Sequence, residues 1–169
     1  MKRLGVMLAV LAFMLGLFPS QAISREKSLK SQLIGTWTLV SWDQTLANGS
    51  KNQRFGSNPK GINTFDAKGN FSLIIMRPDL PKISGGDPEK PTAEEAAAIA
   101  KGAIAYYGTY TVSESDRSIS LKLTATTLAN QLGVEQKRTV TSINAKEMKY
   151  SNPVSVRGGK IEVVWKRAQ

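Results

Sequence analysis

The ten residues from 33 to 42 constrain the fold more than any other stretch of this 169-residue chain. Gly35-Thr36-Trp37 opens the first segment that alternates like a β-strand, and a glycine at this position lets the backbone enter the strand at a tight angle. Strict alternation sets Trp37 and Trp42 on opposite faces of the strand. The stretch therefore predicts a first strand whose Trp37 can plug one end of a barrel.

The last predicted strand, residues 161 to 167, supports a closed barrel. Its apolar face ends in Arg167, close to the end of the chain. An arginine on such a face needs a partner, and the face of an indole ring provides one through a cation–π contact. We therefore expect Gly35, Trp37 and Arg167 to form a structural closure of the barrel.

Five short runs carry a resemblance to a known family, and they follow one another in that family's order. They are Leu33 to Trp42, Phe55 to Gly61, Met76 to Asp79, Tyr107 to Tyr110 and Val164 to Arg167. Together they resemble the bacterial and fungal lipocalin-like domain family, over roughly residues 33 to 167. The resemblance implies a lipocalin-like (calycin) barrel, in which a first-strand Trp meets a last-strand Arg. It implies little about activity, because the family has no shared catalytic signature to transfer.

The alternation of apolar residues predicts an all-β chain with eight antiparallel strands, the number at which a closed barrel encloses side chains or one small ligand. One α-helix is inserted at residues 92 to 105, where Thr92-Ala93-Glu94-Glu95 forms a capping box. Its small, moderately apolar face suits packing over a barrel mouth or wall. After the first strand, the expected strands lie near residues 61–65, 70–76, 106–112, 118–125, 134–141, 148–152 and 161–167.

Residues 1–22 have the features of a signal peptide. Lys2 and Arg3 precede an apolar run to Phe18, and Ser20-Gln21-Ala22 offers small residues for cleavage. We expect a lead-in segment over 23–32, a barrel domain over 33–169, and a periplasmic or secreted protein. An uncleaved N-terminal anchor is the alternative, and the absence of cysteine excludes a lipobox and its lipid anchor.

The chain contains no histidine and no cysteine. This composition excludes a Ser-His-Asp triad, a cysteine nucleophile and a zinc site with nitrogen or sulfur ligands. Most acidic residues fall in turns or on outward positions, and only Asp43 continues an inward alternation. We therefore expect no catalytic residues, no metal and no cofactor. A barrel enzyme of the isomerase or cyclase kind, with few catalytic groups, is the alternative.

The inward positions suggest where a ligand binds. Arg138 has Gln136 beside it on an otherwise apolar face, and an apolar cavity with one or two polar anchors orients a carboxylate or carbonyl group. Phe71, Arg77 and Tyr110 complete the candidate set. A shift of one residue in the alternation would instead turn Lys137 inward and expose Arg138 to solvent. The sequence thus favours a barrel that binds a small, largely apolar, anionic ligand.

The formal net charge is +10, and it falls to +8 when Lys2 and Arg3 leave with the signal peptide. The basic residues are scattered, so we expect no nucleic-acid binding, which uses positive grooves with exposed aromatic residues. Weak association with an anionic membrane or envelope surface fits the charge better. We expect a monomer whose partner is a small hydrophobic or amphipathic molecule. An envelope protein-interaction module is a further alternative.

Overall fold

The computed structural model describes residues 27–152 and 158–169, so the predicted signal peptide lies outside the described residues. Nine strands form one antiparallel sheet, and the pairing of its first long strand with its last closes it. Eight of the nine make the barrel, since the two-residue β2 (Lys51–Asn52) pairs only with the end of β1 (Gly35–Thr45). The predicted closed eight-stranded barrel is confirmed.

The barrel follows chain order, with each strand antiparallel to the next. Its turns explain this order: at Asp66 to Asn70, for example, Gly69 adopts φ +92° and the Asp66 carboxylate accepts from the Asn70 amide at 2.7 Å. After β1, the barrel strands are β3 (Lys60–Phe65), β4 (Asn70–Met76), β5 (Ala103–Ser113), β6 (Ser118–Thr126), β7 (Gln136–Ile143), β8 (Glu147–Asn152) and β9 (Lys160–Arg167).

Strand β1 contains a β-bulge that the sequence analysis did not foresee. Its register against β9 shifts between Leu39 and Ser41, so one extra residue enters β1. The predicted opposition of Trp37 and Trp42 is therefore wrong, and both side chains pack with the core. Asp43, expected to point inward, instead lines a groove on the outer face, with Lys51 and Glu162.

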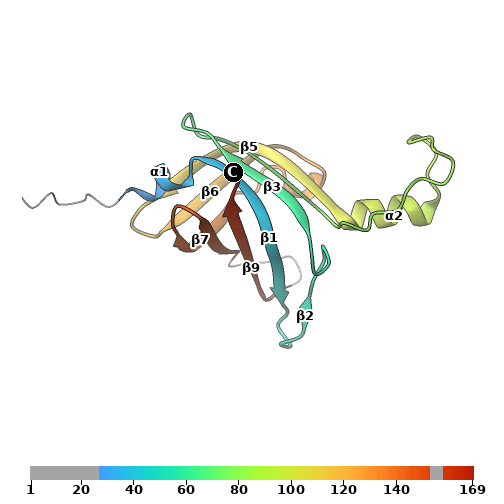
Figure 1. The fold of residues 1–169 in the computed structure, drawn as a ribbon, viewed down its shortest axis with the longest axis horizontal. Coiled ribbons are helices and arrows are strands. Elements are labelled where there is room, and N and C mark those ends of the chain that lie inside the picture. Colours follow the sequence, from blue (N-terminus) through green and yellow to red (C-terminus); the bar gives the residue numbers. More distant parts are fainter. Residues whose placement is uncertain (1–26, 153–157) are drawn as a thin grey trace, which may run out of the picture.

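Three helical segments complete the fold: α1 (Leu29–Leu33), α2 (Ala93–Gly102) and the 3-10 helix η1 (Ala129–Gln131). Helix α1 lies at one end of the barrel, and α2 projects away from the other end (Figure 1). The predicted capping box is present, because the Thr92 hydroxyl accepts from the Glu95 amide and the Glu95 carboxylate accepts from the Thr92 amide. None of the described helices is long and apolar enough to cross a membrane.

The direction of α2 corrects our expectation that it packs over the barrel mouth or wall. Of its ten residues only Gly102 is buried, and the helix passes directly into β5 at Ala103. The alanine-rich face is too small and too weakly apolar to gain much from burial on the barrel. Only the last residues of α2 therefore reach the barrel, at its rim.

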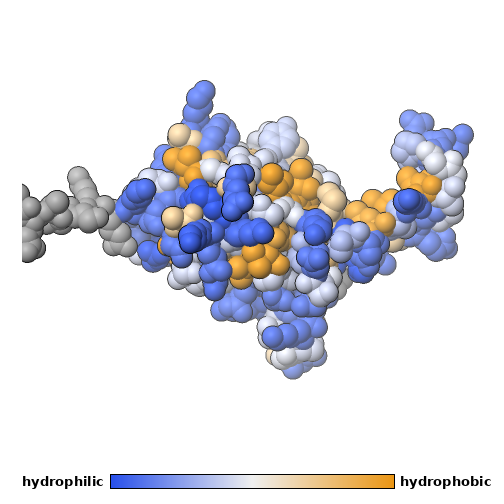
Figure 2. Space-filling model, in the orientation of Figure 1, coloured by the Kyte–Doolittle hydropathy of each residue, from blue (hydrophilic) through white to orange (hydrophobic). Residues whose placement is uncertain are grey.

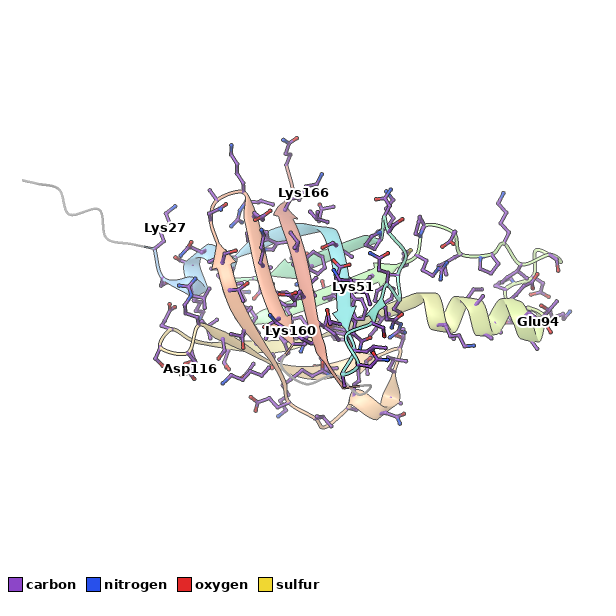
Figure 3. The ribbon with its side chains drawn as sticks, turned by 90° about the horizontal axis from the view of Figure 1, so that it is seen from below. Lys27, Lys51, Glu94, Asp116, Lys160 and Lys166 are labelled. Carbon is purple, nitrogen blue, oxygen red and sulfur yellow. The ribbon has the colours of Figure 1, made fainter. Side chains whose placement is uncertain are left out.

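The outer surface is mixed in character. Figure 2 shows hydrophobic residues in small groups among hydrophilic ones on this face, and Val40, Ile62 and Ile74 are exposed. Charged side chains spread over both the barrel and the projecting arm: in Figure 3, Lys27 lies near α1 and Glu94 near the far end of α2. Charged residues thus occur at both ends of the molecule.

Candidate functional site

One end of the barrel is closed by the contact predicted from the sequence. Arg167 lies over the Trp37 ring, with its guanidinium carbon 4.0 Å from the centroid, and Trp37 is fully buried. The guanidinium donates hydrogen bonds of 2.7–2.9 Å to the carbonyls of Gln32, Ile34 and Ala145. Each guanidinium nitrogen of Arg167 thus has a partner within the fold, so this arginine has a structural role.

Gly35 belongs to the same closure for a steric reason. Its φ of +127° lies where side chains are rarely tolerated, and an added Cβ would stand 2.7 Å from the Arg167 guanidinium. Helix α1 is held over this end by Glu114, whose carboxylate accepts from the backbone amides of Leu29 and Lys30 at 2.7 and 3.1 Å. The closed end is thus fastened from the chain's first and last strands and from the β5–β6 turn.

The half of the barrel next to this closure is filled with side chains. Phe65 stacks near Phe71 and meets Tyr110 edge-on, with ring centroids 6.2 and 5.0 Å apart. The Tyr110 hydroxyl donates to the Asp66 carbonyl at 2.7 Å, and burial raises the pKa of this tyrosine. Phe71 and Tyr110, both predicted ligand contacts, lie in this packed half and outside the lining of the cavity described next.

The other half of the barrel is hollow, with a cavity of about 1300 Å³ that opens at the rim. The change from filled to hollow occurs within single strands. Tyr106 lines the cavity, whereas Tyr110, further along β5, belongs to the packed half. On three other strands, the residue that lines the cavity is likewise two positions from one in the packed half. These pairs are Ile75 and Leu73, Arg138 and Val140, and Ile161 and Val163, with the cavity residue named first. These boundary residues form the floor of the cavity.

Arg138 is the charged group on this floor. Arg138 is 6% exposed and Lys137 is exposed, so Arg138 points into the barrel and the one-residue shift of β7 does not occur. One guanidinium nitrogen donates to Gln136 Oε1 at 2.8 Å and to the Tyr106 hydroxyl at 3.5 Å, and the other to the Lys137 carbonyl at 3.1 Å. All three acceptors are neutral, and within the described chain Arg138 forms no salt bridge.

Tyr150, on β8, lies close to Arg138 but outside the lining of the cavity. It is buried, and this burial raises the pKa of its hydroxyl well above the ordinary value, with Tyr106 acting in the same direction and Arg138 against it. The phenol therefore stays neutral at physiological pH. It gives Arg138 no negative partner.

Most of the remaining cavity wall is apolar. Trp42 meets Phe55 edge-on with centroids 5.2 Å apart, and both line the cavity. Aliphatic side chains add to this apolar surface: Ile75, Leu80, Ile104, Leu128, Val134 and Ile161. Such a surface favours an apolar molecule with few polar groups.

A row of five side chains, four of them polar, crosses one wall. The pairing of Thr139 with Ser151 sets Arg138 opposite Asn152, and Asn152 pairs in turn with Ile161. Ile161 pairs with Gln44 and Gln44 with Asn52, so five neighbouring strands contribute one residue each. All five residues line the cavity. The Asn52 amide donates to Gln44 Oε1 at 3.0 Å, which satisfies this end of the row.

Arg77 lies at the rim. It forms two hydrogen bonds of 2.8 and 2.7 Å to the Asp79 carboxylate, which hold the pKa of Asp79 below its usual value. Nearby, Arg54 donates to the Lys101 carbonyl at 3.0 Å. Arg77 thus has an acidic partner at an exposed site, unlike Arg138.

Of the five predicted ligand contacts, the structure brings Arg138, Gln136 and Arg77 to the cavity. The sequence analysis missed Trp42 and Gln44, because the bulge in β1 reverses their orientation. It did not include Tyr106 or Asn152 among the ligand contacts. The regular alternation of β8 carries the only sequence signal for Asn152, as its position is in phase with the buried Tyr150.

Among the described residues, there is no group of three or more His, Cys, Asp or Glu side chains that could hold a metal ion. The polar groups around Arg138 that line the cavity are its guanidinium, the phenol of Tyr106 and the amides of Gln136 and Asn152. This set can bind and orient an acceptor group.

Comparisons with known proteins give one family match and several structural likenesses. No curated protein matches the chain. Among solved structures it is similar to a redesigned β-barrel (TM-score 0.41, 17% identity, covering 85% of this chain and 98% of that one). It is also similar to a de novo designed fluorescence-activating β-barrel (0.43, 10%, 84% and 99%) and to EF1p2_mFAP2b bound to DFHBI (0.41, 15%, 83% and 98%).

At TM-scores below 0.5 these likenesses add nothing to the strand pairing itself. The family comparison is decisive, because a model described as a lipocalin-like domain matches residues 34–168, from the start of β1 to just past β9. The chain belongs to the lipocalin-like domain family.

Proposed function

We propose that this protein binds a small, largely apolar, anionic molecule in the hollow half of its barrel. The observation that carries the proposal is the buried Arg138, whose described partners are all neutral. A charge removed from water costs several kcal/mol unless an opposite charge and good hydrogen bonds compensate it. A carboxylate on the ligand supplies both.

The cavity supports the apolar part of the proposal. Its volume of about 1300 Å³ is enough for a drug-sized molecule, for which pockets of roughly 300–1000 Å³ are typical. Trp42, Phe55 and the aliphatic residues of the cavity would surround the body of the ligand. The guanidinium on the floor would hold its acid group, so the molecule would enter with that group first.

Location outside the cytoplasm is part of the same proposal. It rests on the signal-peptide pattern of residues 1–22, and the basic charge would favour weak association with anionic envelope surfaces. Intact-mass measurement of the protein from its host tests this directly. Loss of residues 1–22 supports export, and a full-length chain in the cytoplasm contradicts it.

Native mass spectrometry of protein purified from its own host tests binding. We expect an adduct with the wild type, and its loss with Arg138→Gln. Lys149→Gln is the matched control, because it removes the same charge from an exposed β8 position outside this cavity. A charge-assisted hydrogen bond contributes about 1.5–3 kcal/mol, or roughly 10- to 150-fold in affinity.

The outcomes separate the alternatives. An adduct retained equally by Arg138→Gln contradicts an anionic ligand at this site. A bound molecule that is chemically altered on incubation supports the barrel enzyme. A protein that carries no small molecule, and takes up no neutral hydrophobic dye such as Nile red, favours the envelope interaction module.

A further inference from the structure

Gln136 lies beside Arg138 on β7, and the hydrogen bond between the two side chains fixes which way the amide of Gln136 is turned. An Arg138 nitrogen lies 2.8 Å from Gln136 Oε1. A guanidinium carries only N–H donors, so the atom that it contacts must be the amide oxygen and not the amide nitrogen. The oxygen of Gln136 is therefore occupied, and its NH2 group, with two donors, is left for another partner.

This NH2 group is accessible from the cavity. Gln136 is half-buried and lines the cavity. Its amide nitrogen has no acceptor among the described residues, yet it is not one of their buried side-chain atoms without a partner, which are Asn63 Oδ1, Asn152 Oδ1 and Trp165 Nε1. An unpartnered atom outside that group is reached by solvent, so a molecule in the cavity can also reach it.

A single carboxylate can contact both residues. The oxygen and nitrogen of a planar amide are about 2.3 Å apart, so Gln136 Nε2 lies within about 5 Å of the Arg138 nitrogen that binds Oε1. A carboxylate oxygen accepts at about 2.9 Å from each donor, and it can therefore bridge two nitrogens at this separation. Arg138 has five N–H donors and three described hydrogen bonds, so donors remain for the ligand.

We propose that Gln136 determines the specificity of the site: Arg138 holds its amide oxygen, and its NH2 group donates to the same acid group that Arg138 binds. This inference rests on the proposed function and narrows the head group of the ligand to one that only accepts hydrogen bonds. An ionised carboxylate satisfies both donors. A carboxamide of the same shape replaces one acceptor oxygen by N–H donors, which would meet donors and leave them unpaired.

Displacement of the fluorescent hydrocarbon diphenylhexatriene would measure the binding of hexadecanoate and hexadecanamide. The hydrocarbon forms no hydrogen bonds, so its own affinity reports the apolar cavity alone. We expect wild type to bind hexadecanoate about tenfold or more tightly than hexadecanamide. Gln136→Met keeps the length of the side chain without its donors. It should bind hexadecanoate about three- to tenfold more weakly and the hydrocarbon with unchanged affinity.

Gln136→Glu reverses the polarity of this contact. The new carboxylate would pair with Arg138 and repel the acid group of the ligand, so the preference for hexadecanoate over hexadecanamide should fall by about tenfold or more. Gln131→Met and Gln131→Glu are the controls, because Gln131 lines the same cavity but has Thr126 as its described partner in place of Arg138. Both should keep the wild-type preference.

The wild type provides a test that needs no variant to fold. Hexadecanoate should move the side-chain amide protons of Gln136 downfield in the NMR spectrum, as a new hydrogen bond to an anion does. An unchanged Gln136 signal, or Gln136→Met binding the acid as tightly as wild type, would overturn the role of Gln136. The proposed function survives that result if Arg138→Gln still weakens hexadecanoate. If wild type binds acid and amide equally and Arg138→Gln changes neither, the proposed function fails as well.

Discussion

The two halves of the barrel each contain an inward arginine, and the two guanidinium groups have different surroundings. Arg167 lies over Trp37, and each of its three guanidinium nitrogens donates to a backbone carbonyl of the closed end. Arg138 lies beside an open cavity, and its described partners are neutral. The same residue type therefore stabilises the fold at one end and is available to a ligand at the other.

This difference follows from the filling of the two halves. Aromatic rings occupy the interior between the closure and the cavity floor, and removing any of them leaves a void in a close-packed core. The hollow half already borders solvent at its mouth. Substitutions in the closed half should therefore change stability, and those in the hollow half should change binding.

The largest expected effect is at the closure. Trp37→Ala should lower the free energy of unfolding by about 3–5 kcal/mol, the usual cost for a fully buried large aromatic residue. Chemical denaturation monitored by far-UV circular dichroism measures it. Trp42→Ala, on the cavity wall, is the control and should cost clearly less. Equal losses at the two tryptophans would contradict the division into filled and hollow halves.

The next comparison replaces each of the two arginines by leucine. Arg167→Leu should cost about 2–4 kcal/mol of stability, because it removes charge-assisted hydrogen bonds and the cation–π contact. Arg138→Leu should leave the free energy of unfolding within about 1 kcal/mol of wild type, since it also removes the cost of burying a charge. Urea unfolding of both variants decides this. A larger loss for Arg138→Leu would make that residue structural.

Gly35→Ala should have an intermediate effect on the closure. The substitution places a methyl group against the Arg167 guanidinium at a backbone angle that disfavours alanine, and we expect a loss of about 1–3 kcal/mol. Gly133→Ala also has positive φ but meets no atom within 4 Å, so it reports the backbone cost alone. Equal melting temperatures for the two variants would show that the contact with Arg167 contributes nothing to the loss of stability.

The smallest effect concerns the projecting arm. Hydrogen bonds from the backbone amides of Thr92 and Ser84 lower the pKa of Glu95 below its usual value of 4.5. The carboxylate therefore stabilises the start of α2 above about pH 4.5, and this contribution is lost as the pH falls through the lowered pKa. We expect the protection factors of the α2 amides, which correct for the pH dependence of intrinsic exchange, to fall on acidification. Glu94→Gln, outside the capping box, should behave like wild type, whereas Glu95→Gln should lose the pH dependence.

Much of the fold could be predicted from local pattern. Alternation in β4 is unbroken from Asn70 to Met76, and its burial follows that pattern at every residue. The start of α2 could be predicted because the capping box of Thr92 and Glu95 is a local hydrogen-bond pattern. The closure of Trp37 on Arg167 was predictable because both lie at the same end of neighbouring strands.

The site was less predictable because it depends on where the regular pattern stops. The bulge after Leu39 turns Trp42 and Gln44 toward the cavity, and no turn residue marks it in the sequence. The direction of α2 depends on weak packing, which its amphipathic pattern does not determine. Alternation placed Phe71 and Tyr110 inside the barrel but could not show that their half is filled.

The central claim is that Arg138 makes the hollow half selective for an anion, and charge-dependent affinity tests it most directly. Titration calorimetry should compare hexadecanoate with hexadecan-1-ol, which has the same chain without the charge, on wild type and Arg138→Gln. The account predicts that wild type binds the acid at least tenfold more tightly than the alcohol, and that the variant loses this preference while keeping its affinity for the alcohol. Equal affinity of wild type for acid and alcohol would contradict it.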